Sequence, residues 1–375
     1  MVTIKQVTNL HELKTFVDFP NRLYKDCPQF IPSMFGDDMD DWNPKKNPAF
    51  EYCDARCYLA LRDGQVVGRI GAILNHRANE KWGTRRMRFT QVDFIDDTDV
   101  SEALFRTVEN YARECGCTEV HGPLGFCDLD REGMLAEGFD ERSLFITYYN
   151  HPYYIDHLTR LGYVKDVDWT EQLIEIPQDQ ATADMLSRAA RFAMKRMKLH
   201  VADVRHQREY GKYVEQVFRL VNVSYAKLYG TVELSDRQIR RYAKKFIPLI
   251  NPLLTCFVMD SNDEMVAFGV AAPSMESALK NSRGRIFPTG WIGILHSLHK
   301  NDSIDMFLIA VHPDLWGTGV NAIILDHVLR GCHKMGITTA ETGPMLETNM
   351  NIQLQWKFLK ARQHKRRRCF IKLLG

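Results

Sequence analysis

A glycine-containing stretch late in the chain has residue types suited to binding an anion. It runs Phe307-Leu-Ile-Ala-Val-His-Pro-Asp-Leu-Trp-Gly-Thr-Gly-Val-Asn-Ala-Ile-Ile-Leu, which reads as an apolar strand, a loop with Gly317 and Gly319, and an amphipathic helix. Glycines let a backbone turn tightly and approach a ligand closely. The start of a helix presents unpaired N–H groups and a partial positive charge. The stretch therefore predicts a pyrophosphate site; a tight turn with no ligand is the alternative.

Candidate proton acceptors lie at the ends of two predicted strands. Asp305 has the same alternation along its strand as Val311, which places both on one face if the strand is regular. Glu341 and Glu347 flank the end of the next strand, and His312 directly follows the first. Each is a residue type that can act as a general base. The alternative for each is a solvated side chain at a strand end.

Two other features carry weaker signals. The nine cysteines are odd in number and scattered, and the pairs Cys53/Cys57 and Cys115/Cys117 lack partners at zinc-site spacing. We expect reduced thiols and no metal site. The cationic run 364–368 fits a solvated strand edge, a contact to a ribose phosphate, or a nucleic-acid surface. Because no aromatic residues interleave with it, we do not expect a nucleic-acid partner.

Length and composition limit the number of domains and the classes of partner that this protein can have. The chain has 375 residues, 45% of them hydrophobic, and a net charge of only +2. This length favours two domains, and the charge gives no global field for nucleic acid. No apolar run approaches the length of a membrane span, and the first residues lack the apolar core of a signal peptide. We expect a cytoplasmic protein with no membrane partner and an unknown oligomeric state.

The same order of elements appears twice, and internal repeats constrain architecture strongly. In the first half we expect a hairpin around Asp63-Gly64, a helix with a capping box at Asp99 and Glu102, and a strand ending in Gly-Pro. The predicted elements of this half are 57–61, 66–74, 88–94, 100–114, 118–121, 154–161 and 168–176. Those of the second half are 256–259, 265–272, 304–311, 321–335, 338–342, 354–360 and 367–374. We place the domains at 1–180 and 181–375.

The glycine stretch resembles motif A of the GCN5-related N-acetyltransferases (GNAT), in which a strand, Val-x-Pro and a Gly-x-Gly loop bind the pyrophosphate of coenzyme A. The resemblance implies an α/β (α+β) fold of two tandem GNAT-like domains, each a mixed, mostly antiparallel central sheet flanked by helices. It implies acetyl-CoA, or another acyl-CoA, as co-substrate. The residues that it places at the cofactor are Ile309, Val311, Trp316, Gly317, Thr318, Gly319, Val320, Asn349 and Trp356.

The resemblance also implies a reaction. The backbone N–H of Val311 would polarise the acyl carbonyl, and Asp305, Glu341 or Glu347 would take the proton of an amine on a small molecule or peptide. Asp314 stands where the family has Arg or Gln. Trp356 stands where many members have a general-acid tyrosine, and an indole N–H is no acid near neutral pH.

The first half resembles the same fold without the phosphate loop. Asp96, Asp97 and Asp99 crowd the corresponding helix start, which satisfies that end internally and repels a pyrophosphate. We expect no coenzyme A in this half. In the second half, Tyr225 and Tyr229 fit either a pocket wall or the core, and the segment 274–295 fits either a lid or acceptor wall, or a packing excursion.

Three functions remain open. The first is an N-acyltransferase that uses acyl-CoA. The second is a non-catalytic coenzyme A sensor or scaffold, motivated by Asp314 and Trp356. The third is a transferase that uses aminoacyl-tRNA, as other tandem GNAT-fold enzymes do. It predicts that neutralising the arginines at 366–368 weakens RNA binding.

Overall fold

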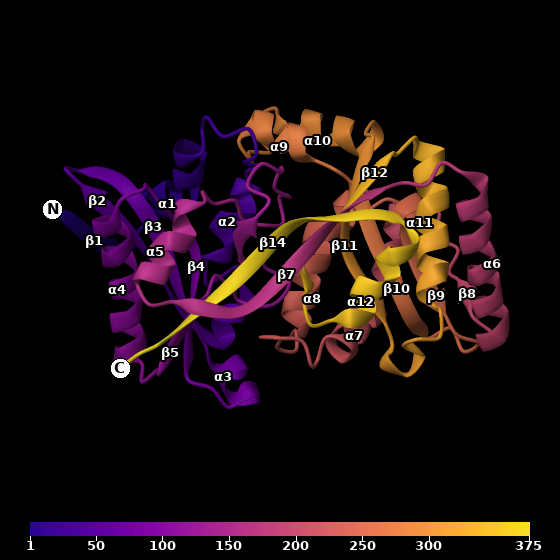
Figure 1. Cartoon of the computed structure of the whole chain (residues 1–375), viewed down its shortest axis with the longest axis horizontal. Helices are drawn as coiled ribbons and strands as arrows, with labels where there is room; N and C mark the ends of the chain where they lie inside the picture. Colours follow the sequence, from indigo (N-terminus) through magenta and orange to yellow (C-terminus); the bar gives the residue numbers. More distant parts are fainter. The chain divides into compact units, whose positions relative to one another are not determined.

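The computed structural model describes residues 1–375, except for the side chains of Asn351 and Lys357. The chain forms two compact units (Figure 1). The first unit comprises residues 1–170, 276–293 and 364–375, and the second comprises 171–275 and 294–363.

The first unit contains a mixed sheet with helices packed against it. Its strands are β1 (Val2–Gln6), β2 (Cys53–Arg62), β3 (Gln65–Asn75), β4 (Arg86–Phe94), β5 (Glu119–Gly122) and β6 (Met134–Glu137). Its helices are α1 (Leu10–Leu23), α2 (Phe35–Asp41), α3 (His76–Trp82), α4 (Thr98–Glu114), α5 (Tyr153–Arg160) and α9 (Glu276–Ser282). The strand order is β1-β2-β3-β4-β5-β14, where β14 spans Lys360–Leu373, and β4 with β5 is a parallel pair.

The second unit repeats that plan. Its strands include β8 (His200–Val201), β9 (Thr255–Met259), β10 (Met265–Pro273), β11 (Ser303–Val311), β12 (Thr339–Thr342) and β13 (Met345–Leu346). Its helices include α6 (Gln180–Met197), α7 (Val214–Ser224), α8 (Asp236–Phe246), α11 (Asn321–Met335) and α12 (Met350–Leu354), and α10 spans Gly290–His299. The strand order is β8-β9-β10-β11-β12-β7, where β7 spans Val164–Glu175, and β11 with β12 is again the parallel pair. The predicted duplication is confirmed.

The closing strands are exchanged between the two halves of the sequence. Strand β14 (Lys360–Leu373), from the end of the chain, pairs antiparallel with β5 of the first half, with Phe370 opposite Gly122. Figure 1 shows this yellow strand beside the purple β5. Strand β7 (Val164–Glu175), from the first half, pairs with β12, with Ile174 opposite Ala340. The predicted strand 168–176 belongs to the first half of the sequence and the predicted strand 367–374 to the second, but each strand completes the sheet built from the other half.

Local sequence explains most of the other elements. The hairpin β2–β3 turns at Asp63 and Gly64, which both have positive φ angles, 51° and 76°. Helix α4 buries one stripe of side chains at helical spacing, Val100, Leu104, Phe105, Val108 and Ala112. The corresponding stripe of α11 is Ile323, Ile324, Val328, Leu329 and Cys332.

Two local predictions were wrong. The cap of α4 is Asp97, whose carboxylate accepts from the N–H groups of Asp99 and Val100, so the helix begins earlier than the capping box at Asp99 implied. The predicted helix 354–360 is instead the end of α12, a 3₁₀ turn over Gln355–Phe358, and the first residue of β14.

Candidate active site

The central feature of the second unit is a gap between two parallel strands. Strands β11 and β12 pair only from Ser303 opposite Thr339 to Met306 opposite Thr342, and Gly343 adds a last bond to the carbonyl of Met306 over 3.0 Å. Strand β11 continues to Val311. No described strand pairs with that edge of β11 beyond Met306, so the N–H groups of Ile309 and Val311 face the gap.

A β-bulge sits at the start of this gap. Leu308 lies opposite Val270 and Met306 opposite Ala271, so Phe307 is the extra residue. The bulge reverses the alternation of side chains. Before it, Ile304 and Met306 pack with the core under α6 and α11; after it, Ile309 and Val311 do so.

The bulge corrects the argument that paired Asp305 with Val311. Asp305 alternates with Ile304 and Met306, so it lies on the opposite face of the sheet, the face on which Leu308 and Ala310 pack with α7. The equal spacing in sequence was misleading, because the extra residue between the two positions exchanges the faces.

The backbone of Val311 is oriented into the gap. His312 donates its N–H to Val266 over 2.8 Å, and in an antiparallel ladder the neighbouring residue directs its N–H and C=O away from that partner. Two side chains confirm this direction, because Ser224 Oγ and Trp316 Nε1 donate to the Val311 carbonyl over 3.1 and 2.8 Å. The Val311 N–H points the same way, as the predicted oxyanion donor requires.

A pocket lies at the gap. Most of its lining is apolar: Tyr225, Gly269, Val270, Ala271, Met306, Phe307, Leu308, Ile309, Ile324, Val328, Thr342, Gly343, Pro344, Met345, Ile352 and Trp356. Side chains from both faces of the sheet contribute, including Tyr225 after α7 and Ile324 from α11. The Tyr225 hydroxyl donates to the Ile309 carbonyl over 2.9 Å. Tyr225 therefore lines this pocket, one of the two alternatives left open for it.

The glycine loop leads from the gap to the start of α11. Residues Pro313–Leu315 form a 3₁₀ turn, and Gly317 and Gly319 have φ angles of 75° and 90°. A Cβ at either glycine would meet no atom within 4 Å, so glycine is needed there for its conformation. In the part of the chain that the structure describes, the N–H groups of Gly317, Gly319 and Val320 make no hydrogen bond. They fit an anionic group.

Asp314 is exposed to solvent and lies beside His312. Its side chain is 86% exposed, and its carboxylate lies 3.5 Å from His312 Nδ1. The Thr318 hydroxyl donates to the Leu315 carbonyl and closes the turn. The acidic residue at the family's Arg or Gln position therefore leaves the free N–H groups of the loop accessible.

Two candidate bases lie side by side. Asp305 is opposite Glu341 in the parallel register of β11 and β12, and both are buried. They directly precede the pocket-lining residues Met306 and Thr342. Glu347 follows β13 and is partly exposed. The described lining of the pocket includes neither Glu347 nor Asn349.

Two other side chains bear on mechanism. Trp356 is buried in the pocket wall, and its indole N–H donates to the Met345 sulfur over 3.2 Å. Cys332 lies within α11, where burial raises the pKa of its thiol to about 12. A thiol held in its neutral form is a poor nucleophile.

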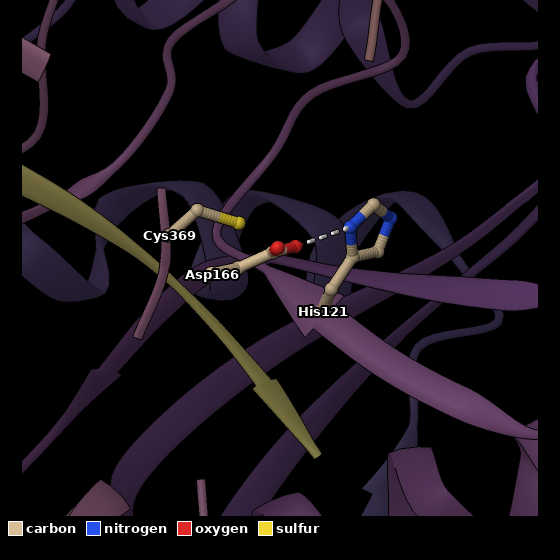
Figure 2. A group of neighbouring side chains, drawn as sticks. All are labelled: His121, Asp166 and Cys369. Carbon is tan, nitrogen blue, oxygen red and sulfur yellow. Dashed lines mark ion pairs between the residues drawn. The ribbon is translucent and has the colours of Figure 1, made fainter. Parts of the chain in front are cut away.

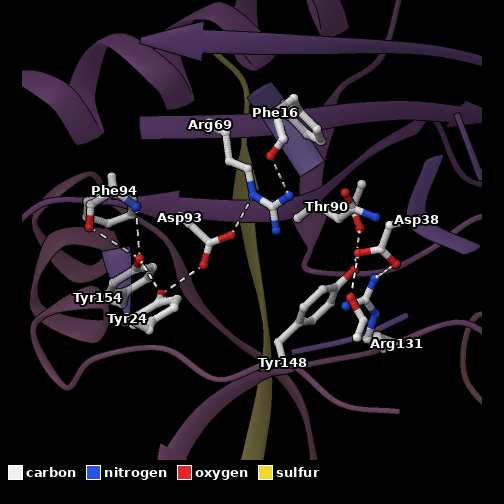
Figure 3. A network of polar contacts seen from close by, with 12 residues as sticks. Phe16, Tyr24, Asp38, Arg69, Thr90, Asp93, Phe94, Arg131, Tyr148 and Tyr154 are labelled. Carbon is white, nitrogen blue, oxygen red and sulfur yellow. Dashed lines mark hydrogen bonds and ion pairs between the residues drawn. The ribbon is translucent and has the colours of Figure 1, made fainter. Parts of the chain in front are cut away.

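The first unit closes the equivalent position with its own side chains. Phe94 ends β4 as Val311 ends β11, and it donates its N–H to the Tyr154 hydroxyl over 2.8 Å (Figure 3). The Tyr153 hydroxyl donates to its carbonyl over 2.6 Å. Asp97 caps α4 and pairs with Arg62 at 2.5 Å, which lowers the pKa of Asp97. The prediction that this helix end is satisfied internally is confirmed.

Polar pairs fill the neighbouring interior of that unit. Arg69 of β3 pairs with Asp93 of β4 over 2.7 Å, and the Tyr24 hydroxyl donates to the same carboxylate over 2.8 Å (Figure 3). Asp38 pairs with Arg131 nearby. Arg69, Asp93, Asp38 and Arg131 line one pocket of the first unit, where each arginine pairs with one of the two carboxylates. These buried ion pairs belong to the interior of the unit.

The two candidate carboxylates have no counterpart in the first unit. Asp305 opposite Glu341 is the third pair of its parallel ladder, and the third pair of the other ladder is Arg88 opposite His121. His121 gathers with Asp166 of β7 and Cys369 of β14 (Figure 2), with Nδ1 at 3.9 Å from the Asp166 carboxylate. Arg86 also contacts Asp166, at 3.5 Å. We interpret this group as a polar cluster in which Arg86 forms the ion pair with Asp166, while burial lowers the pKa of His121 and keeps the imidazole neutral.

The basic run 364–368 is not a surface. Lys365 and Arg367 are among the largest fully buried side chains; Lys365 donates to the Arg142 carbonyl and Arg367 to Thr147 Oγ1 over 2.9 Å. Arg366 and Arg368 both pair with the buried carboxylate of Asp168. The solvated-edge interpretation was wrong, and these contacts remove the basis for an RNA surface at this run.

Comparison with known proteins confirms the fold. The chain is a tandem GNAT-fold protein: it matches a tandem GNAT protein from the clavulanic acid biosynthesis pathway over 100% of this chain and 99% of that one, with a TM-score of 0.56 at 13% identity. No protein-family model matches the sequence. None of the described helices has the length and apolar character needed to cross a membrane.

Two curated proteins are similar in sequence. Protein YghO of Escherichia coli (strain K12) is 25% identical over 378 residues, which cover 98% of this chain and 95% of that protein. The bacterial ceramide synthase of Caulobacter vibrioides (strain NA1000 / CB15N) is 27% identical over 291 residues, 76% of this chain and 74% of that protein.

Proposed function

We propose that this protein is an N-acyltransferase that uses an acyl-CoA and acts on the amine of a long-chain amino alcohol. The observation that carries the proposal is the gap beside β11. There an apolar pocket, the outward-directed N–H of Val311 and the free N–H groups of the glycine loop follow one another along β11 and the loop after it. The acyl chain, the thioester and the diphosphate of an acyl-CoA are joined in the same order.

The reaction would be direct attack of the amine on the thioester carbonyl. The Val311 N–H stabilises the negative charge that develops on the carbonyl oxygen. Asp305 or Glu341, directly or through water, takes the proton of the amine from the face on which Asp305 lies. The C–N bond forms as the C–S bond breaks, and coenzyme A leaves as a thiol.

Tyr225 is the side chain that we assign to protonate the departing sulfur. Trp356 occupies the family's usual acid position and cannot supply a proton. The Tyr225 hydroxyl lies in the same pocket and is positioned by its bond to the Ile309 carbonyl. A phenol can donate a proton, so this residue can replace the missing acid. Tyr225→Phe should lower kcat and leave the KM for acyl-CoA nearly unchanged.

The substrate class rests on two observations. The pocket lining is mainly aliphatic and aromatic, which favours an acyl chain over a polar group. One similar protein is a bacterial ceramide synthase, and a ceramide is the amide of a fatty acid with a long-chain amino alcohol. An acetyl group and a small polar amine would leave most of this lining without a partner.

The test is an acyl-transfer assay with acyl-CoA of chain lengths from C2 to C18, each offered sphinganine, a short amino alcohol or a peptide amine. Free thiol is measured with a chromogenic disulfide, and the amide is identified by mass spectrometry. We expect turnover with long acyl chains and sphinganine. Turnover only with acetyl-CoA and polar amines would contradict the substrate class. Calorimetric binding of acyl-CoA without turnover on any amine would favour the sensor.

A further inference from the structure

The segment from Ile286 to Leu295 exposes apolar side chains in a way that a water-facing surface does not explain. Phe287 is 78% exposed, Ile292 55% and Trp291 45%. Leu295, one turn further along α10, is also exposed. The same helix buries a polar residue, Ser297, together with Ile294. An apolar face turned outward with a serine turned inward marks an interaction surface.

This segment is held in place and is not a loose loop. Arg285 pairs with Asp18 over 2.8 Å and lies over the Phe35 ring. Phe35 donates its N–H to the Gly284 carbonyl over 2.9 Å, and Lys280 Nζ donates to the Pro28 carbonyl over 2.6 Å. These contacts answer the question left open for residues 274–295: the segment packs on the first unit. None of its residues is in the described lining of the pocket at β11.

The Lys and Arg side chains of the segment have no acidic counterpart within the segment itself. Between Glu276 and Asp302 the sequence contains no acidic residue, and its cations are Lys280, Arg283, Arg285 and Lys300. Arg283 and Lys300 are exposed. The Trp291 indole donates to the Pro288 carbonyl over 3.1 Å, which fixes an aromatic ring with a polar edge at the surface. Exposed Trp, Phe and Ile beside Arg and Lys form the pattern of a segment that lies in a lipid interface.

We propose that residues 280–300 dock this protein on an anionic lipid bilayer. Phe287, Trp291, Ile292 and Leu295 enter the boundary between head groups and acyl chains, and Arg283 and Lys300 contact lipid phosphates. A surface contact of this kind needs no spanning helix, so it replaces the expectation of no membrane partner. This proposal does not depend on the proposed acyl transfer, and a measurement of lipid binding tests it directly.

The experiment is co-sedimentation of the full chain with vesicles of phosphatidylglycerol and phosphatidylcholine, compared with phosphatidylcholine alone. We expect at least tenfold stronger partitioning to the anionic vesicles, reduced by salt. Phe287→Ser with Ile292→Ser should reduce it at least tenfold, and Arg283→Gln with Lys300→Gln should abolish the preference for anionic lipid. Leu10→Ser removes another exposed leucine, 62% exposed, and should change nothing.

Two further measurements distinguish a lipid bilayer from a second copy of the chain as the partner of this apolar face. Quenching of tryptophan fluorescence by brominated lipids should disappear largely in Trp291→Phe, because that ring is assigned to the interface. Sedimentation velocity without lipid tests a second copy of the chain as the occupant. Vesicle binding that Phe287→Ser and Ile292→Ser leave unchanged would overturn the proposal, as would a dimer that the same changes dissociate.

Discussion

Trp316 donates its indole N–H to the carbonyl of Val311 over 2.8 Å, beside the backbone N–H assigned to the acyl oxygen. Ser224 Oγ donates to the same carbonyl, so both of its lone pairs are used. An amide of the acyl-CoA arm that pairs along β11 must compete with Trp316. Strand β11 is thus partly occupied by the protein's own donors.

Trp316→Phe should therefore strengthen acyl-CoA binding. The change keeps an aromatic ring and frees one lone pair of the Val311 carbonyl oxygen for a hydrogen bond from the ligand. A hydrogen bond of this kind contributes about 1 kcal/mol of binding free energy, or about a fivefold lower KM. Steady-state kinetics with varied acyl-CoA measures the effect. Trp82→Phe, a similarly exposed tryptophan on α3, is the control. A higher KM would mean that the Trp316 indole N–H contributes to binding.

Gly319→Ala should weaken acyl-CoA binding far more than it weakens the fold. At φ 90° a Cβ costs about 1–2 kcal/mol, and the loop can relieve this only by redirecting its N–H groups. We expect KM for acyl-CoA to rise about tenfold or more. Gly336→Ala, with φ 71° and equally open space, should cost similar stability and leave KM unchanged. Equal effects of both changes on KM would argue against an anion site.

Asp305→Asn and Glu341→Gln test the candidate base. The residue that takes the amine proton should lose about 10²–10⁴ in kcat, with the KM for acyl-CoA little changed. Its variant should also lose the acidic limb of the pH–rate profile. Asp302→Asn changes an exposed carboxylate just before β11 and should leave kcat unchanged. Full kcat in both variants would leave water alone as the base.

His121 should make stability depend on pH. Burial lowers the pKa of His121 to about 4 from an ordinary 6.5. Between these values the unfolded chain binds a proton that the folded chain does not, so stability is complete above pH 6.5 and falls as the pH falls towards 4. From pH 7 to pH 5 the wild type should lose about 2 kcal/mol more than His121→Gln.

Urea unfolding at the two pH values measures this difference. His11→Gln, which removes an exposed histidine, should behave like the wild type. Equal losses in the wild type and His121→Gln would show that His121 takes up its proton in the folded state as readily as in the unfolded chain.

Arg367→Gln should destabilise the fold. The side chain is fully buried, and its loss leaves Thr147 Oγ1 and the Tyr148 carbonyl without their donor. We expect a cost of about 3 kcal/mol by thermal unfolding. Arg188→Gln, on the exposed face of α6, should stay within about 0.5 kcal/mol. Weaker RNA binding at unchanged stability would instead support the tRNA-dependent alternative.

Several features were predictable because they depend on neighbours in sequence. The hairpin at Asp63-Gly64, the two repeats and the loop from Pro313 to Gly319 follow from periodicity and turn chemistry. The acidic residues at the helix start in the first half predicted that a carboxylate caps this helix. The capping residue is Asp97, whereas the predicted capping box began at Asp99. Local patterns of this sort are set by sterics within a few residues.

Other features depend on distant partners. Strand β14 has a pattern that either sheet could accept, and only tertiary pairing places it beside β5. The bulge at Phe307, which turns Asp305 to the opposite face from Val311, is set by the register of β10 against β11. From the sequence, Arg366 and Arg368 fitted a solvent-exposed strand edge. In the folded protein both guanidinium groups pair with the carboxylate of Asp168.

The sequence by itself determined that the same order of elements occurs twice and that only the later copy has a Gly-x-Gly loop between its strand and its helix. The tertiary structure decided which strand closes each sheet, which carboxylates stand together at β11 and β12, and which cations are buried. Spacing along a chain fixes backbone conformation, whereas strand register and burial arise from contacts between residues far apart in sequence.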